Sequence, residues 1–339
     1  TALCPNAYCI LYWTRGVLVP CVWFLPPLFD YDGSLHMKTT HWDGVRVRVY
    51  RPRKNATESD GAIIYIHGGG FVLGNTEMFE PLTRLMAREM NTRLLVSIDY
   101  RLSPETFFPS ALEDCEKVLN YVFTHGPSIY GIDPKKIVVM GDSAGGNLAA
   151  ALSQRRTASK AEPALLGQVL LYPYLQLSDL QTYSYRQYKR ELDGLAFVGA
   201  AGIDVYAHPE YARAALTNGH VNEEARRLRD ELMDYSELPF EFRNDVNGTD
   251  LPLPVEPNEA LMAEIGPILV NPDFAPLMRR DLSNLPSALV VTCEYDFLRD
   301  DGAVYAQRLK KAGVPTRWSH YKNGVHGMLN FPDFLQITQ

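Results

Sequence analysis

The sequence has no run of lysine or arginine and no surplus of positive charge. Its 339 residues include 33 Lys and Arg against 40 Asp and Glu, so its net charge is −7 at pH 7. Proteins that bind nucleic acid present a clustered basic patch to the phosphates. We therefore expect no nucleic-acid partner.

Cysteine is scarce, and the common motifs for metals and nucleotides are missing. The chain has no Cys-x-x-Cys pair, no His-x-x-x-His, and no G-x-G-x-x-G or G-x-x-x-x-G-K after a strand. We therefore expect neither a bound metal nor a cofactor. A single disulfide stays open among the five scattered cysteines, which are Cys4, Cys9, Cys21, Cys115 and Cys293.

Long unbroken hydrophobic runs are missing as well. Residues 17–29 are almost wholly apolar, but Pro20, Pro26 and Pro27 interrupt them. A spanning helix needs about 20 consecutive apolar residues. We interpret residues 1–40 either as an arm packed on the protein or as the remnant of a membrane anchor. No complete signal peptide is visible.

The body of the chain alternates between short apolar runs and helical patterns. Val45, Val47 and Val49 alternate with polar residues, which is typical of a half-buried antiparallel strand. We expect further strands at 62–66, 93–99, 137–140, 168–172, 287–292 and 316–321, and helices at 81–90, 110–124, 147–154 and 302–312. This order predicts an α/β fold with a mostly parallel central sheet and helices on both faces.

The alternation disappears between residues 175 and 270, where Tyr, Arg and Glu are frequent. We interpret 175–270 as a helical cap inserted over the sheet, with 41–174 and 271–339 forming the core. A second independent domain is the alternative.

The central motif is Gly141-Asp142-Ser143-Ala144-Gly145, which lies between an apolar strand and an expected helix. In a G-x-S-x-G elbow the serine sits on a strained turn that exposes its hydroxyl, and side chains at the two glycines would clash with their neighbours. The sequence therefore predicts an α/β-hydrolase fold with Ser143 as the nucleophile.

A second glycine motif follows another strand at His67-Gly68-Gly69-Gly70. Consecutive glycines leave backbone N–H groups open toward an oxyanion. We expect the N–H groups of Gly68, Gly69 and Ala144 to donate there. His67 is interpreted as a structural member of this oxyanion loop rather than as a base.

A serine nucleophile needs a base and an acid that orients it. His326 lies in a glycine-flanked loop after the last strand, and His320, inside that strand, is the weaker candidate. Asp296 follows an apolar strand and is the expected acid, so the order is serine, acid, histidine. Asp300 and Asp301 are interpreted as the cap and first-turn charges of the next helix. We interpret the other histidines considered as surface residues, namely His36, His41, His125, His208 and His220.

Several motifs together resemble the hormone-sensitive-lipase branch of the α/β-hydrolases, and within it the arylacetamide deacetylase and neutral cholesterol ester hydrolase group. The resemblance covers about residues 41–332 and is carried by His67–Gly70, Asp99–Glu105 with Phe108-Pro109, Gly141–Ala150, Cys293–Gly302 and Gly324–Gly327. It implies hydrolysis of carboxylic esters, or of aryl amides, without a cofactor. It implies the same roles for Ser143, Asp296, His326 and the oxyanion loop.

The resemblance also implies an endoplasmic-reticulum enzyme with a lumenal catalytic domain, attached to the membrane through its N-terminus. A cytoplasmic location is the alternative. Two Asn-x-Thr sequons, at Asn55 and Asn247, would be glycosylated in the lumen. In one respect the chain departs from the family: Cys293 is present, but Val72 occupies the position of its disulfide partner.

Two other functions stay open from the sequence. A neutral-lipid or cholesteryl ester hydrolase would use the same residues on a bulkier substrate. A ligand receptor on the same fold would not be catalytic, although such receptors typically lose the histidine that this chain retains.

Overall fold

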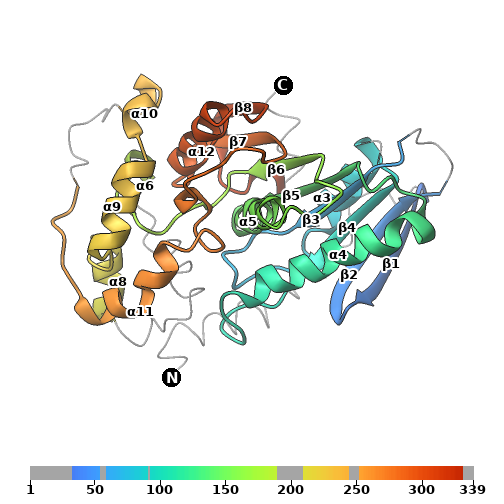
Figure 1. The fold of residues 1–339 in the computed structure, drawn as a ribbon, viewed down its shortest axis with the longest axis horizontal. Coiled ribbons are helices and arrows are strands. Elements are labelled where there is room, and N and C mark those ends of the chain that lie inside the picture. Colours follow the sequence, from blue (N-terminus) through green and yellow to red (C-terminus); the bar gives the residue numbers. More distant parts are fainter. Residues whose placement is uncertain (1–32, 54–58, 91, 189–208, 244–251, 331–339) are drawn as a thin grey trace, which may run out of the picture.

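The computed structural model describes residues 33–53, 59–90, 92–188, 209–243 and 252–330. Its centre is an eight-stranded sheet with the order β1-β2-β4-β3-β5-β6-β7-β8 (Figure 1). The strands are β1 (Leu35–Trp42), β2 (Val45–Pro52), β3 (Ala62–Ile66), β4 (Leu94–Asp99), β5 (Ile137–Asp142), β6 (Gly167–Leu171), β7 (Ser287–Tyr295) and β8 (Thr316–Val325).

The sheet is parallel from β4 to β8. β2 pairs antiparallel with both β1 and β4, as the alternation of its valines predicted. Because parallel strands end at the same edge of a sheet, the loops after β3, β5, β7 and β8 gather at one edge. These four loops carry His67–Gly70, Ser143, Asp296 and His326.

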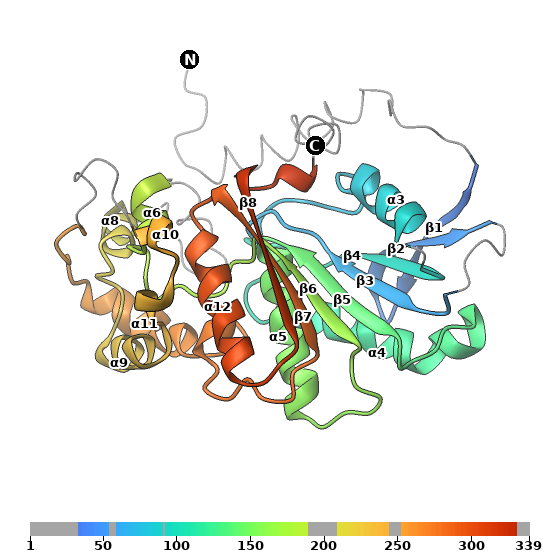
Figure 2. The ribbon, with the colours of Figure 1, turned by 90° about the horizontal axis from the view of Figure 1, so that it is seen from above.

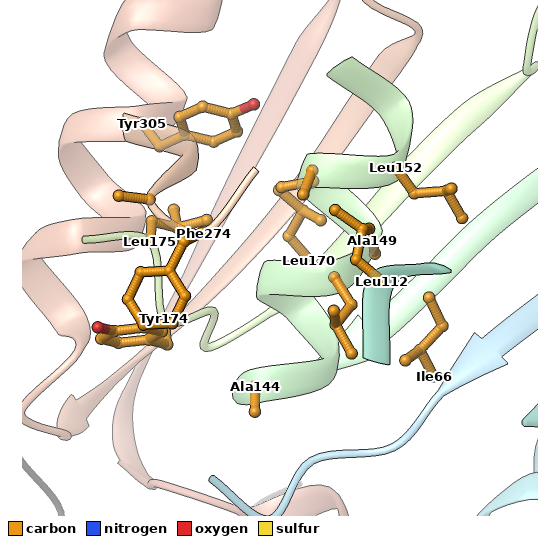
Figure 3. Packing of buried hydrophobic residues seen from close by; sticks show 14 of the residues in the cluster. Ile66, Leu112, Ala144, Ala149, Leu152, Leu170, Tyr174, Leu175, Phe274 and Tyr305 are labelled. Carbon is orange, nitrogen blue, oxygen red and sulfur yellow. The ribbon is translucent and has the colours of Figure 1, made fainter. Parts of the chain in front are cut away.

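Helices cover both faces of the sheet (Figure 2). α3 (Glu80–Glu89) packs Leu82 and Met86 on one face, together with Tyr65 of β3. The other face carries α4 (Ser110–Tyr130), α5 (Ala144–Ala158) and α12 (Arg299–Lys311). Figure 3 shows Ala149 and Leu152 of α5 in one cluster with Leu170 of β6 and with Leu175 and Phe274.

The segment between β6 and β7 contains short helices joined by turns and irregular stretches in the part that the structure describes. It contains α6 (Tyr183–Tyr188), α8 (Pro209–Leu216), α9 (Glu223–Leu232), the 3₁₀ turn η2 (Tyr235–Glu237), α10 (Phe240–Arg243) and α11 (Glu259–Leu269). These helices gather at one end of the molecule beside α12 (Figures 1 and 2). Ala214, Leu228 and Leu261 belong to the same buried cluster as the sheet. This continuity favours an insertion into the core over an independent domain.

Several expected boundaries differ from the structure. Residues 35–40, assigned to the N-terminal arm, belong to β1. α4 continues to Tyr130 and passes through Pro127, and Ser110 is its first residue rather than its cap. Residues 17–29 lie outside the described part. Within that part, no helix is long and apolar enough to cross a membrane.

Candidate active site

The turn between β5 and α5 places Ser143 in a strained backbone conformation, with φ of 54° and ψ of −118°. The turn is packed tightly against neighbouring backbone. A Cβ on Gly145 would lie 2.0 Å from the carbonyl oxygen of Ile66, and one on Gly141 would lie 2.2 Å from that of Gly145. Both glycines are therefore required by packing, as the motif predicted.

The structure brings the three predicted side chains together. Oγ of Ser143 lies 3.0 Å from Nε2 of His326, and Nδ1 of the same imidazole lies 3.0 Å from Oδ2 of Asp296. The two ring nitrogens thus face a hydroxyl on one side and a carboxylate on the other. A carboxylate at Nδ1 holds that proton in place and leaves Nε2 able to accept the serine proton.

Neighbouring groups fix the acid and the imidazole in place. The other oxygen of the buried Asp296 carboxylate, Oδ1, accepts a hydrogen bond from the N–H of Leu298 at 2.8 Å. The backbone N–H of His326 donates to the carbonyl of Tyr295 at 3.3 Å. Its ring contacts the rings of Tyr172 and Phe297, at centroid distances of 5.0 and 5.3 Å. Nε2 of the imidazole is therefore held facing the Ser143 hydroxyl.

His67 is structural in this arrangement. It is fully buried, its ring stacks on Tyr100 and Phe79, and its Nδ1 lies 2.7 Å from the carbonyl oxygen of Gly68. Burial lowers the pKa of His67, so the imidazole is neutral near pH 7. Its role is to support the glycine loop, and it does not contact Ser143.

The expectation for Gly68 needs correction. Its N–H donates to Oδ1 of Asp142 at 2.8 Å, so it is already used inside the protein. The next N–H groups along the loop are those of Gly69 and Gly70, which have φ of 117° and 62°. These left-handed conformations suit glycine. Gly69 and Gly70 are therefore candidate oxyanion donors in place of Gly68, together with Ala144, whose N–H begins α5.

Asp142 makes contacts beside the nucleophile that the sequence analysis did not predict. It is buried, and one carboxylate oxygen accepts from both the Tyr65 hydroxyl at 2.7 Å and the Gly68 N–H at 2.8 Å. The residue thereby joins the elbow to the oxyanion loop. Asp142 occupies a variable position of the G-x-S-x-G motif, so the motif does not predict this contact. A carboxylate directly before the nucleophile, on a strand beside a glycine loop, was the available signal.

Burial raises the pKa of Asp142 to about 6, against the hydrogen bonds from Tyr65 and Gly68, which favour the ionised form. Stability therefore falls as the pH rises from the ordinary pKa of the carboxyl to about 6, and stays lower above it. The folding stability of the protein is therefore expected to depend on pH through Asp142.

The remaining candidates lie elsewhere. His320 is half-buried and bonds to Thr292 and Glu294, at 3.0 Å each, and not to Ser143. His36, His41 and His125 are exposed, as expected, whereas His208 lies outside the described residues. The surface interpretation of His220 is wrong: it is buried, and its Nε2 lies 2.7 Å from the carbonyl oxygen of Leu177.

Asp300 and Asp301 also differ from their expected role. Both lie in the first turn of α12, but Leu298 occupies the cap position and both carboxyl groups are fully buried. Burial raises the pKa of each carboxyl. Asp301 is bonded to the inserted segment, and Asp300 is bonded both to that segment and to Arg299, the first residue of its own helix.

Cys293 is a buried free thiol whose Sγ lies 3.7 Å from Sδ of Met328. Asn55 and Asn247 lie outside the described residues. In the part of the chain that the structure describes, no group of three or more His, Cys, Asp and Glu side chains is arranged to hold a metal.

Comparison with known proteins gives the family. A sequence model of the family described as "alpha/beta hydrolase fold" matches residues 63–232 and 258–330. Neutral cholesterol ester hydrolase 1 of Bos taurus is 35% identical over 314 residues, which cover 88% of this chain and 75% of that protein. Arylacetamide deacetylase of Mus musculus is 33% identical over 318 residues, covering 89% and 76%.

Solved structures give the same result. One titled as an arylesterase has a TM-score of 0.64 at 28% identity and covers 96% of this chain and 87% of its own. An esterase of Pyrobaculum calidifontis has a TM-score of 0.62, with the same identity and coverage. The chain belongs to the α/β-hydrolase family. These four relatives are ester hydrolases and an arylacetamide deacetylase.

The pKa of Asp142 leads to a prediction about stability. A carboxyl whose pKa is raised on folding favours the folded state below its unfolded pKa, and this is lost as pH rises through about 6. Asp142→Asn keeps an acceptor oxygen for Gly68 but cannot ionise. We expect its free energy of unfolding, relative to that of wild type, to rise by about 2 kcal/mol from pH 4.5 to pH 7.5.

Urea denaturation at the two pH values measures this difference. Asp142→Ala is the matched variant, because it also cannot ionise but removes the acceptor; we expect its ester turnover to fall well below that of Asp142→Asn. The same pH dependence of stability in wild type and Asp142→Asn would contradict the assignment.

Proposed function

We propose that the protein hydrolyses carboxylic esters in two steps, through an acyl-enzyme on Ser143. The observation that carries the proposal is the pair of 3.0 Å distances that join Ser143 to His326 and His326 to Asp296. The strained elbow and the glycine loop lie at the same edge of the sheet, and ester hydrolases are among the relatives of the chain.

In the first step, Ser143 Oγ attacks the ester carbonyl while Nε2 of His326 takes its proton. Asp296 stabilises the imidazolium that forms. The carbonyl oxygen becomes an oxyanion, to which Gly69, Gly70 and Ala144 donate N–H groups. The tetrahedral intermediate then collapses: the bond to the alcohol oxygen breaks, His326 returns the proton to that oxygen, and the acyl group stays on Ser143.

In the second step a water molecule takes the place of the alcohol. His326 removes its proton as the oxygen attacks the acyl carbon, and the same N–H groups stabilise the second oxyanion. The proton then returns to Ser143 Oγ, the acid leaves, and the free serine is restored. Every proton transfer in this cycle uses Nε2 of one imidazole.

Replacing Ser143 tests the nucleophile directly. We expect Ser143→Ala to lower turnover of a p-nitrophenyl ester by at least about 10³-fold with unchanged circular dichroism. His326→Gln should have a similar effect. His320→Gln, a control with the same substitution at a histidine 3.0 Å from Glu294 rather than from the serine, should retain wild-type turnover.

A fluorophosphonate probe separates an enzyme from a ligand receptor on the same fold. An enzyme reacts with the probe at Ser143, whereas a receptor does not react. Substantial residual hydrolysis by Ser143→Ala would refute the mechanism.

A second candidate is a hydrolase of neutral lipid esters, favoured by the 35% identity to neutral cholesterol ester hydrolase 1. The resemblance to arylacetamide deacetylase supports small aryl esters or amides instead. A panel of p-nitrophenyl esters from acetyl to palmitoyl, with an acetanilide and a cholesteryl ester, measures the difference. A small-ester enzyme should lose kcat/KM steeply with chain length; a lipid hydrolase should reach its maximum on the longer esters.

We propose a lumenal location at the endoplasmic-reticulum membrane, from the family resemblance and the two sequons. On expression in mammalian cells, endoglycosidase treatment should then increase the gel mobility of the protein. The double variant Asn55→Gln/Asn247→Gln should already run at the faster position and show no shift. A wild-type protein without a shift would favour the cytoplasmic alternative.

A further inference from the structure

The first turn of α6 lies directly on the loop between β7 and α12. Oγ of Ser184 donates to the carbonyl of Phe297 at 2.8 Å, and its backbone N–H donates to Oδ2 of Asp300 at 2.7 Å. The N–H of Asp300 points back to the serine hydroxyl at 3.3 Å. All three residues are buried. A helix of the insertion is thus hydrogen-bonded to the residues that follow Asp296.

The other end of α6 is attached through Arg299, the first residue of α12. Nη2 of Arg299 donates to Oε1 of Gln187 at 2.9 Å and to the carbonyl of Phe242 in α10 at 3.1 Å. Nη1 donates to Oε1 of Glu294 at 2.9 Å, on the strand that leads to Asp296. The guanidinium has no solvent exposure. A buried charge is tolerated only when it is paired and hydrogen-bonded, so these partners are tightly specified.

Asp301 completes the set. Its carboxyl accepts from the side-chain amide of Gln176 at 3.0 Å and from the N–H of Leu175 at 3.4 Å. Three consecutive residues therefore each bind the inserted segment, and they follow Asp296 by only three to five positions. The insertion and the acid-bearing loop are held as one unit.

Packed aromatic rings also connect α6 to His326, the predicted base. The ring of Tyr185 in α6 meets that of Phe297 edge-on, with centroids 5.3 Å apart. The Phe297 ring in turn lies 5.3 Å from the imidazole of His326. Aromatic pairs at this distance have preferred geometries, so a shift of one ring displaces the next. The insertion is thus connected to His326 through packed rings, and to the loop after Asp296 through hydrogen bonds.

We propose that Ser184 is a positioning residue, through which the docked insertion sets the geometry of Asp296 and His326. The proposal rests on the proposed ester hydrolysis. Helix α6 of the insertion would then hold Asp296 and His326 in their relative positions. Loss of the Ser184 contacts should lower the rate of chemistry even for a substrate too small to need the insertion.

Ser184→Ala is the direct test, because it removes the hydroxyl at both of its loop contacts and leaves no buried charge unpaired. Ser178→Ala is the matched control. Ser178 is equally buried in the segment after β6, but its hydroxyl lies 3.8 Å from Sδ of Met278, away from the acid loop. Ser184→Ala should lose more thermal stability than Ser178→Ala, because the Ser184 hydroxyl makes hydrogen bonds to the loop, so the test is evaluated from kcat and the pH profile of the folded variants.

The substrate for the test is p-nitrophenyl acetate. We expect Ser184→Ala to lower kcat about tenfold and to change KM less than about twofold, since small displacements of reacting groups reduce rate more than binding. The acidic limb of kcat against pH, which reports protonation of the base, should also move. Ser178→Ala should match wild type in kcat and in pH profile.

A second pair of variants keeps the test decisive if Ser184→Ala does not fold. Tyr185→Leu removes the ring that packs on Phe297, whereas Tyr185→Phe retains it. We expect the leucine variant to show the loss of kcat and the phenylalanine variant to stay within about twofold of wild type.

The outcomes separate this proposal from the function on which it rests. An active wild type, with Ser184→Ala or Tyr185→Leu equal to its control in kcat and pH profile, overturns the positioning role alone. A wild type that neither hydrolyses the ester nor reacts with a fluorophosphonate overturns the proposed function, and the positioning role with it.

Discussion

The close approach of the α5 N-terminus to β3 is the constraint on which the site depends. The carbonyl of Ile66 lies where a side chain at position 145 would have to be, and this lets the turn close with Ser143 at positive φ. The same approach places the glycine loop, which begins one residue after Ile66, beside the N-terminus of α5. Asp142 fastens that contact by accepting the N–H of Gly68. Nucleophile and oxyanion donors are therefore two results of one packing arrangement.

Much of this arrangement was predictable, because it depends on local chemistry. The elbow needs two glycines around a serine between a strand and a helix, and that pattern is contiguous in sequence. The parallel sheet followed from apolar runs that alternate with helical periods. Acid and base could be chosen because the ends of parallel strands meet at one edge, which brings Asp296 and His326 to Ser143 from far along the chain.

What could not be predicted depends on tertiary partners. Asp142 and Gly68 are 74 residues apart, and only pairing of β3 with β5 makes them neighbours. His220 looked like a surface residue because its polar surroundings in sequence say nothing about the insertion that buries it. Asp300 and Asp301 fit a helix start by composition, yet each also bonds to a residue more than 100 positions earlier, Ser184 and Gln176 respectively. In each case the local sequence suggested one position for a polar side chain, whereas its partners in the structure lie far away in the sequence.

The chain order has a consequence for biosynthesis. Ser143 and His326 are separated by 183 residues, and the whole insertion lies between them. A ribosome releases β1 to β6 and the elbow first, so the serine turn can form while the acid and base are still unmade. Proton transfer becomes available only when β7 pairs with β6 and β8 pairs with β7, after the insertion has been synthesised. A nascent chain therefore carries an inert serine, and activity shows that β7 and β8 have joined the sheet.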